Sequence, residues 1–360
     1  MSGGISGRFS RKVTIVSFIL SIFVMYIHAN KLSSIGAQGT PVYVLNKILA
    51  GTFGQVGVPF FFLQSGYWMF RFDIFEEKSG ILKRKLKKKV YSLGVPFLLW
   101  NTFGLLFFLI ATRLPVISSM INGGQVVPIT LRNIFGGIFL HQYYIVFWFM
   151  QDLIVVTALT PVLIRLLRNR YLTYAAILTL LVLAVLGINP PVCQTTSLLL
   201  FTLGGALAVY HREYWEAFRG SYFHAGRYLV LFLVFAAFRW LSLPVLSTIS
   251  VIVSPILFWK SCDLLTRFKL FDREPLWFCK QSFFLYAAHD FPVETLSAIL
   301  SRASNNMAWI AISYIVTPLV VLACLYIAAR FLSRRLPKVY QLLCGGRTSS
   351  CPSRSPSSSE

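Results

Sequence analysis

Residues 13–30 read VTIVSFILSIFVMYIHAN, a run that contains no Asp, Glu, Lys or Arg. At about 1.5 Å per residue, a helix of this length nearly crosses a hydrocarbon core about 30 Å thick. Similar runs recur along all 360 residues, mean hydropathy is +0.68, and only 13% of residues are charged. Lipid offers the backbone no hydrogen bonds, and the runs lack the alternating polarity of barrel strands. The sequence therefore predicts an all-α, polytopic transmembrane helix bundle.

The apolar runs divide into ten predicted spans, and the turn signal Asn189-Pro190-Pro191 separates the fifth from the sixth. The expected spans are 13–30, 51–70, 90–112, 141–164, 171–189, 192–210, 228–243, 245–263, 276–298 and 308–331.

Basic residues indicate how this bundle is oriented. Of the 34 Lys and Arg residues, 28 fall in alternate loops. The exceptions in the other loops are Lys31, Lys47, Arg113, Arg132 and Arg302, and Arg239 lies within a span. Because cytoplasmic loops carry the excess of basic residues, both termini are expected in the cytoplasm. A net charge of +22 spread over short loops indicates contact with membrane lipid, and we expect no nucleic-acid partner.

The chain divides into two predicted regions. Residues 1–343 form the membrane-embedded domain, and residues 344–360 are rich in Gly, Ser, Pro and Arg. A segment of this composition buries little apolar area, so we expect a disordered cytoplasmic tail.

Two histidines are candidates for catalysis. His28 lies near the outer end of the first span on a polar face with Ser17 and Ser21, and His289 lies on the ninth span. Intramembrane polar groups are costly and often functional, and a neutral imidazole can accept a hydroxyl proton. Each histidine also has a simpler interpretation, as an interfacial side chain or a buried group satisfied by a neighbouring helix. Either Asp290 or Glu294 could orient a histidine, and spacing does not choose between them.

Two further charged features have structural alternatives. The run from Lys83 to Lys89 can bind anionic lipid or clamp the phosphates of coenzyme A. Asp152 lies in the middle of the fourth span, and Arg239 is its expected partner in a structural ion pair.

Three blocks of sequence resemble the acyltransferase-3 family, the integral membrane O-acyltransferases of bacterial envelopes. The blocks are FILSIFVMYIH at 18–28, VPFFFLQSGY at 58–67 and SFFLYAAH at 282–289, with VPFLLWN at 95–101 after the basic loop. Their order and spacing extend the resemblance over nearly the whole chain. Many relatives carry an Arg about eleven residues before the histidine, where this sequence has Ser17, and the basic run here is mostly Lys.

The resemblance implies transfer of an acyl group from acyl-CoA, with acetyl-CoA the first choice, to a hydroxyl of a cell-surface polysaccharide or lipid-linked glycan. It implies a multi-pass protein of the bacterial inner membrane that uses no metal. Catalysis is expected at His28 and His289. The expected donor-binding residues are Lys83, Arg84, Lys85, Lys88 and Lys89. The expected substrate-binding residues are Ser65, Tyr67, Trp148 and Tyr286.

Two other classes fit the same composition. A transporter or flippase for a glycan or lipid-linked precursor also needs many spans and intramembrane polar groups, although the chain shows no internal repeat. An inactive membrane scaffold is the third interpretation. Loss of one acyl group from envelope glycans when the gene is removed would separate the enzyme from both.

Overall fold

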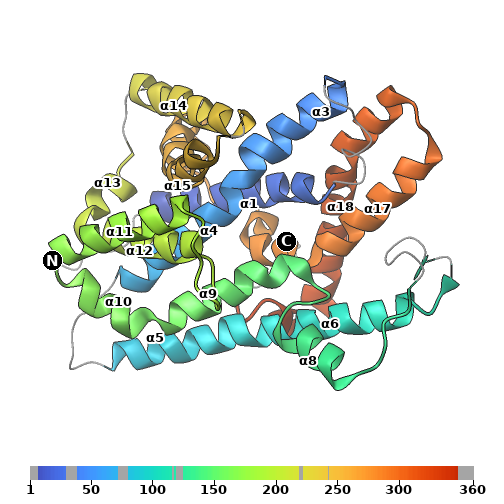
Figure 1. Ribbon diagram of the computed structural model, residues 1–360. Coiled ribbons are helices and arrows are strands. Elements are labelled where there is room, and N and C mark those ends of the chain that lie inside the picture. Colours follow the sequence, from blue (N-terminus) through green and yellow to red (C-terminus); the bar gives the residue numbers. More distant parts are fainter. Residues whose placement is uncertain are drawn as a thin grey trace, which may run out of the picture.

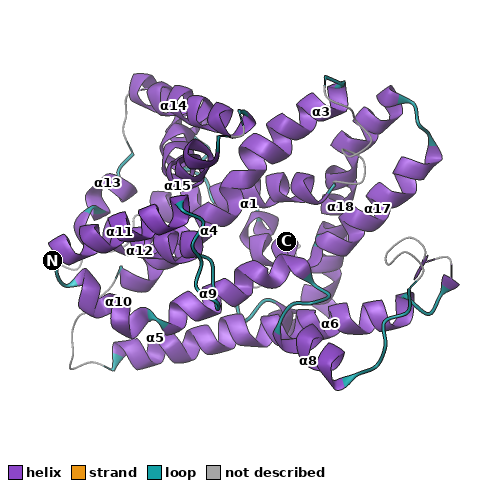
Figure 2. Ribbon diagram, in the orientation of Figure 1, coloured by secondary structure: helices purple, strands orange, loops and turns teal. Residues whose placement is uncertain are grey.

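The computed structural model describes residues 7–29, 39–71, 80–115, 117–118, 125–218, 222–241 and 243–347. Within these residues every regular element is helical, as the sequence predicts (Figure 2). The first half contains α1 Gly7–His28, α3 Pro41–Asn46, α4 Gln55–Phe70, α5 Ile81–Lys89, α6 Val95–Ala111, α8 Leu131–Phe139, α9 Trp148–Ala158 and α10 Thr160–Leu167. The second half contains α11 Arg170–Val185, α12 Thr195–Tyr210, α13 Arg212–Glu216, α14 Tyr222–Trp240, α15 Pro244–Ser261, α16 Ser282–Ala288, α17 Asp290–Ala303, α18 Met307–Arg335 and α19 Pro337–Leu343.

Six helices in the described part of the chain are long and apolar enough to cross a membrane. They run over Gly7–His28, Pro41–Phe70, Ile81–Ala111, Tyr222–Trp240, Pro244–Phe268 and Met307–Arg335. A seventh span results if Ile145–Ala158 and Thr160–Leu167, which meet at 58°, count as one. Helices α11 and α12 are apolar but only 16 residues long each. Each of the ten predicted segments therefore contains helix, but not every one contains a full-length span.

Prolines lie close to the points where two predicted spans break. Pro161 follows the bend between α9 and α10, and Pro292 lies in the first turn of α17, just after the break at His289. Proline lacks a backbone N–H and its ring clashes with the carbonyl four residues earlier, which favours a break or a kink. Pro59, Pro255 and Pro318 nevertheless lie inside continuous helices. The predicted ninth span becomes two short helices, with His289 and Asp290 at their junction.

Helix α4 lies at the centre of the fold and packs against α1, α12 and α15 (Figure 1). Its closest contact is with α12, where a Cβ at Gly66 would lie 2.0 Å from the carbonyl oxygen of Phe201. A Cβ at Gly204 would similarly lie 2.0 Å from the oxygen of Leu63. The glycine of the Ser65-Gly66-Tyr67 motif is therefore required for two backbones to touch, as at other close helix crossings in membranes.

The outer surface is apolar. Helix α6 exposes Leu98, Leu99, Phe103, Leu106 and Ile110. An exposed apolar face of this kind on a helix long enough to span a bilayer is expected to contact lipid.

The packed part of the chain continues past the predicted boundary at residue 343. Cys344 is buried, and the indole Nε1 of Trp100 donates to the carbonyl of Leu343 over 3.1 Å. The described chain ends at Arg347, and the remainder of the predicted tail, residues 348–360, lies outside the described residues.

Candidate active site

His28 and Asp290 form a hydrogen-bonding contact between the first helix and the helix junction near residue 289. Nδ1 of His28 lies 2.9 Å from Oδ1 of Asp290, and their side chains are 24% and 9% exposed. Because a carboxylate only accepts, Nδ1 of His28 donates and Nε2 keeps its lone pair in the neutral ring. Asp290, one of the two acids that the sequence leaves open, therefore contacts His28.

His289 contacts His28 directly. The two rings meet edge to face, with centroids 4.9 Å apart. Nδ1 of His289 faces the carbonyl oxygens of Tyr286 at 2.8 Å and Leu285 at 3.1 Å, so it carries the proton. Nε2 is buried and has no hydrogen-bond partner among the described residues. The structure therefore brings both predicted catalytic histidines together, and each presents an unprotonated Nε2.

A third histidine, His141, makes a different contact. Nδ1 of His141 lies 2.7 Å from Oε1 of Gln151. The backbone of His141 has a φ of 48°, a left-handed conformation that suits the tight turn before α9.

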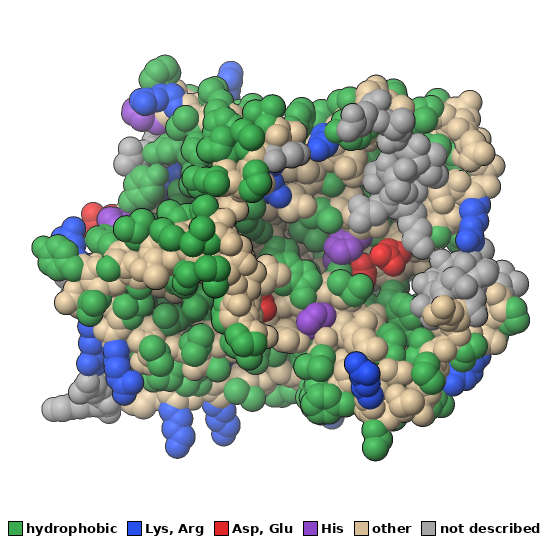
Figure 3. Space-filling view, in the orientation of Figure 1, with side chains coloured by type: hydrophobic (Ala, Val, Ile, Leu, Met, Phe, Trp, Pro, Cys, Tyr) green, Lys and Arg blue, Asp and Glu red, His purple; other side chains and the backbone are tan. Residues whose placement is uncertain are grey.

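His28 lines a cavity of about 430 Å³, which we call the His28 cavity. Val24 and Ile27 continue its wall along α1, and Gln55, Val58, Pro59 and Phe62 form the α4 side. Trp148, Gln194, Thr196, Ser197, Leu200 and others complete it. Apolar walls with a few polar groups are typical of a small-molecule site. Histidine and acidic side chains also gather in the central hollow of the face shown in Figure 3.

Asp152 supports the wall of the His28 cavity. Its Oδ2 accepts hydrogen bonds from Ser197 Oγ at 2.6 Å and from the Gln194 backbone N–H at 3.0 Å. The expectation that Asp152 pairs with Arg239 is wrong, since its carboxylate faces the start of α12 instead of α14. A buried acid at a helix start satisfies free backbone N–H groups, which explains its place without a cationic partner.

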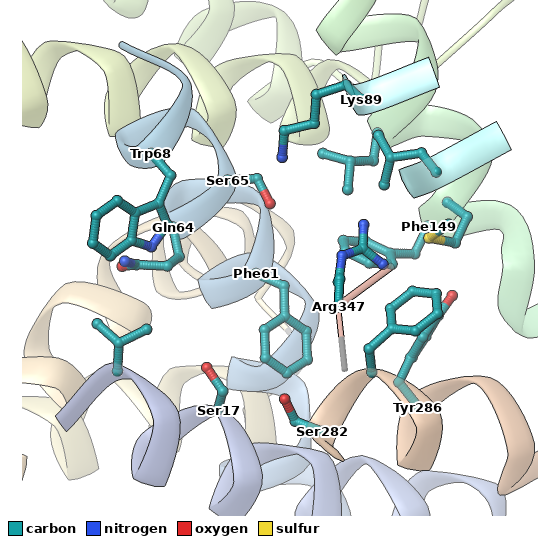
Figure 4. A pocket seen from close by; sticks show the side chains of 15 residues that line it. Ser17, Phe61, Gln64, Ser65, Trp68, Lys89, Phe149, Ser282, Tyr286 and Arg347 are labelled. Atoms are coloured by element: carbon teal, nitrogen blue, oxygen red, sulfur yellow. The ribbon is translucent and has the colours of Figure 1, made fainter. Parts of the chain in front are cut away.

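A second cavity of about 300 Å³, here called the Lys89 cavity, lies farther along the same helices (Figure 4). Lys89 and Arg347 point into it, and Ser17, Gln64, Ser65, Ser282 and Tyr286 are among its lining residues. The amide of Gln64 is buried, and neither of its polar atoms has a partner in the described structure. Of the described residues that line this cavity, none is acidic.

Aromatic side chains separate the two cavities. Phe61 and Phe149 line the Lys89 cavity, whereas Phe62 and Trp148 line the His28 cavity. The rings of Phe62 and Phe149 meet edge to face at 4.7 Å, and those of Phe62 and Trp148 lie 6.4 Å apart. Ser17 in one cavity and His28 in the other are eleven residues apart on α1, which corresponds to about 16 Å.

The predicted basic clamp divides into two groups. Lys83, Arg84 and Lys88 are exposed on α5. Lys85 donates to the carbonyl of Met69 over 2.9 Å, and Lys89 alone of these five lines the cavity.

The four predicted substrate-binding residues also separate. Ser65 and Tyr286 line the Lys89 cavity, and Trp148 lines the His28 cavity. Tyr67 lines neither of them. Its buried hydroxyl accepts a hydrogen bond from Arg71 Nε at 3.1 Å and donates one to Glu216. Glu216 also accepts a hydrogen bond from Arg71 Nε at 2.5 Å. The structure therefore gives Tyr67 a role in joining α4 to α13.

Neither of the basic residues nearest Ser17 in the sequence reaches the Lys89 cavity. Lys12 is buried in an ion pair with Asp263 at 2.7 Å, and Arg11 donates to the carbonyl of Phe271 over 2.8 Å. The second cation of the cavity, Arg347, was missed because the composition around it predicts a disordered tail. No signal in the sequence places that segment beside Lys89.

His28, which is paired with Asp290, lines one cavity, and two cations line a second cavity in the same helix bundle. The family model of the acyltransferase-3 domain, described as an acyltransferase domain, matches residues 14–329. The chain belongs to this family and is an acyltransferase of the membrane-protein class. No curated protein and no solved structure matches it.

Proposed function

We propose that the enzyme transfers an acetyl or related acyl group from acyl-CoA to a hydroxyl of a cell-surface polysaccharide or lipid-linked glycan. The observation that supports this most is the placement of His28 and Lys89 in two cavities that are both lined by α1 and α4 and are separated by packed aromatic rings. One cavity offers a base beside polar groups, and the other offers cations without acids. These are the requirements of an alcohol and of a phosphate-bearing donor, respectively.

The chemistry follows from the His28–Asp290 pair. Nε2 of His28 accepts the proton of the acceptor hydroxyl, and the oxygen attacks the thioester carbon. The carbon–sulfur bond then breaks, and the coenzyme A thiolate takes the proton back from His28. Asp290 stabilises the imidazolium between these two steps, as an acid does in a hydrolase triad. His289 packs against the His28 ring and helps to hold it in place.

The aromatic rings that separate the two cavities have a role in the proposed reaction. The pantetheine arm must pass Phe62, Phe149 and their neighbours to bring the thioester to His28. Rings packed at this point exclude water from the thioester, and exclusion of water limits wasteful hydrolysis.

The proposed membrane arrangement keeps ten spans and both termini in the cytoplasm of a bacterium. The exposed Lys and Arg side chains of α5 would then face the cytoplasm, where acyl-CoA is available, and the anionic lipid of the cytoplasmic leaflet. The His28 cavity would receive the glycan from the opposite side. Helix α5 and α13 lie toward one end of the bundle and α3 toward the other, in keeping with this orientation (Figure 1).

The test is a comparison of envelope glycans with and without the gene by mass spectrometry. The proposal predicts loss of one acyl mass from one glycan and its return with the wild-type gene but not with His28→Ala. Transport by a flippase would instead change the amount or location of the glycan without an acyl difference. An unchanged acyl pattern would contradict the proposal.

A further inference from the structure

The end of the described chain is held beside Lys89 by well-defined contacts. The hydroxyl of Tyr340 on α19 donates to Oε1 of Gln281 over 3.0 Å. The indole of Trp100 bonds the last residue of α19, as described above, and Cys344 is 2% exposed. These contacts fix the segment against α6 and the start of α16.

Two glycines then turn the chain toward the cavity. Gly345 has a φ of 60° and Gly346 a φ of 74°. The N–H of Gly346 donates to the carbonyl of Gln341, and that of Gly345 to the carbonyl of Leu342. This pair of bonds is a Schellman helix end, which needs a left-handed residue after the helix. A Cβ at Gly345 would lie 2.3 Å from the carbonyl oxygen of Ser92, so the turn packs tightly against the segment that follows Lys89.

Arg347 leaves this turn and enters the Lys89 cavity. Its guanidinium carbon lies 4.2 Å from the centre of the Phe283 ring, and Lys89 lines the same cavity (Figure 4). Arginine stays charged at neutral pH. The two cations share a cavity, and its described lining holds no acid. A bound anion would stabilise this arrangement.

Gln64 gives an independent indication of a ligand. Its side chain is 6% exposed, it lines the same cavity, and its amide is without a hydrogen-bond partner among the described residues. Leaving buried polar atoms unpaired is costly, and such a pair of atoms is expected to meet a ligand or water. The amide can accept from and donate to the amide groups of a pantetheine arm, which extends inward from the phosphates.

We propose that Arg347, carried by the C-terminal segment, completes a phosphate-binding site with Lys89 and that this site holds the diphosphate of coenzyme A with its pantetheine arm directed at Gln64. This inference rests on the proposed function for the identity of the donor. The anionic site itself rests on the two cations and on Gln64.

The experiment compares binding of three probes to the full-length protein purified in detergent, by titration calorimetry. Coenzyme A carries the phosphates and the arm, pantetheine carries the arm alone, and phosphatidylglycerol carries a lipid phosphate. The variants are Arg347→Gln and, as a matched control, Arg335→Gln at the exposed end of α18. Loss of a charge-assisted contact to phosphate should raise the Kd for coenzyme A about 10- to 100-fold in Arg347→Gln and leave that for pantetheine unchanged.

Equal coenzyme A binding by Arg347→Gln and Arg335→Gln would overturn the inference, as would a wild type that binds no coenzyme A. A loss of phosphatidylglycerol binding without a loss of coenzyme A binding would overturn it in favour of a lipid site. Acetyl transfer from acetyl-CoA with an unchanged donor KM in Arg347→Gln would overturn the inference and leave the proposed function standing. If coenzyme A binding depended on Arg347 but the wild type transferred no acyl group, the phosphate-binding site would be supported and the proposed function would be wrong.

Discussion

Nδ1 of His28, the last residue of the first helix, lies 2.9 Å from the carboxylate of Asp290, the first residue of α17. The contact joins residues that are far apart in the sequence and, in the neutral ring, places the proton of His28 on Nδ1. The proton on Nδ1 is the condition for Nε2 to act as a base.

Asp290→Asn should therefore lower kcat by about 10²- to 10⁴-fold with little change in the donor KM, because an amide can stabilise the wrong tautomer of His28. The measurement is acyl transfer by purified protein at saturating donor. Glu213→Gln on α13 is the control, since it removes an exposed carboxylate from another helix. If the two variants were equally active, Asp290 would not orient the base.

The variant His289→Asn tests the two ring nitrogens of His289 separately. The Asn amide can still donate to the carbonyl of Tyr286, as Nδ1 does at 2.8 Å, but it removes Nε2 and the ring edge that contacts His28. We expect normal expression and a kcat about 10-fold lower, because the His28 ring loses one of its supports. A kcat loss as large as that of Asp290→Asn would instead give His289 a direct part in proton transfer. Wild-type kcat would show that His289 only fills space.

Gly66→Ala tests the crossing of α4 and α12. The new methyl would lie 2.0 Å from the carbonyl oxygen of Phe201, so one helix must move. We expect a loss of stability of at least about 1–3 kcal/mol, seen as a lower Tm in detergent or as failed expression. Gly226→Ala on α14 is the control, because its methyl would meet no atom within 4 Å and should not lower Tm. Equal melting of the two variants would contradict the close crossing.

The Arg71–Glu216 contact predicts a pH dependence. Burial acts to raise the pKa of Glu216, but hydrogen bonds from Arg71 and Tyr67 outweigh it and hold the pKa below its usual value. Folding thus favours the ionised form of Glu216. The stability that this carboxylate contributes to the fold is complete above the ordinary pKa of Glu, and it is lost as the pH falls through the lowered pKa of the folded state. Glu216→Gln should lower stability at pH 7 by about 1–3 kcal/mol, with the Tm of wild type and variant converging in acid. Glu213→Gln, an exposed neighbour, serves as the control. A Tm difference independent of pH would contradict this prediction.

Much of the fold is readable from the sequence because lipid forces apolar runs such as residues 13–30 to become helices. The breaks are less readable. Pro292 alone does not show whether the chain kinks or starts a new helix, and the structure decides this by packing Tyr144 against the junction, where its hydroxyl bonds the carbonyl of Ala287 at 2.5 Å.

The candidate site is readable only in part. His28 and His289 stand out as polar groups within apolar runs, and their proximity becomes visible only when α1 packs against α16 and α17. Pairing is a tertiary property, so the sequence leaves Asp290 and Glu294 equal and assigns Asp152 a wrong partner. Arg347 is hidden for another reason. Its neighbours Gly345 and Gly346 resemble a flexible tail in composition, although here they form a helix end.

The most direct test of the central claim is the acyl-transfer rate of His28→Ala, measured with acetyl-CoA and isolated envelope glycan at matched expression in membranes. If Nε2 of His28 is the base, the rate should fall by about 10³-fold or more while coenzyme A still binds. Transfer at a rate near that of the wild type would contradict the account.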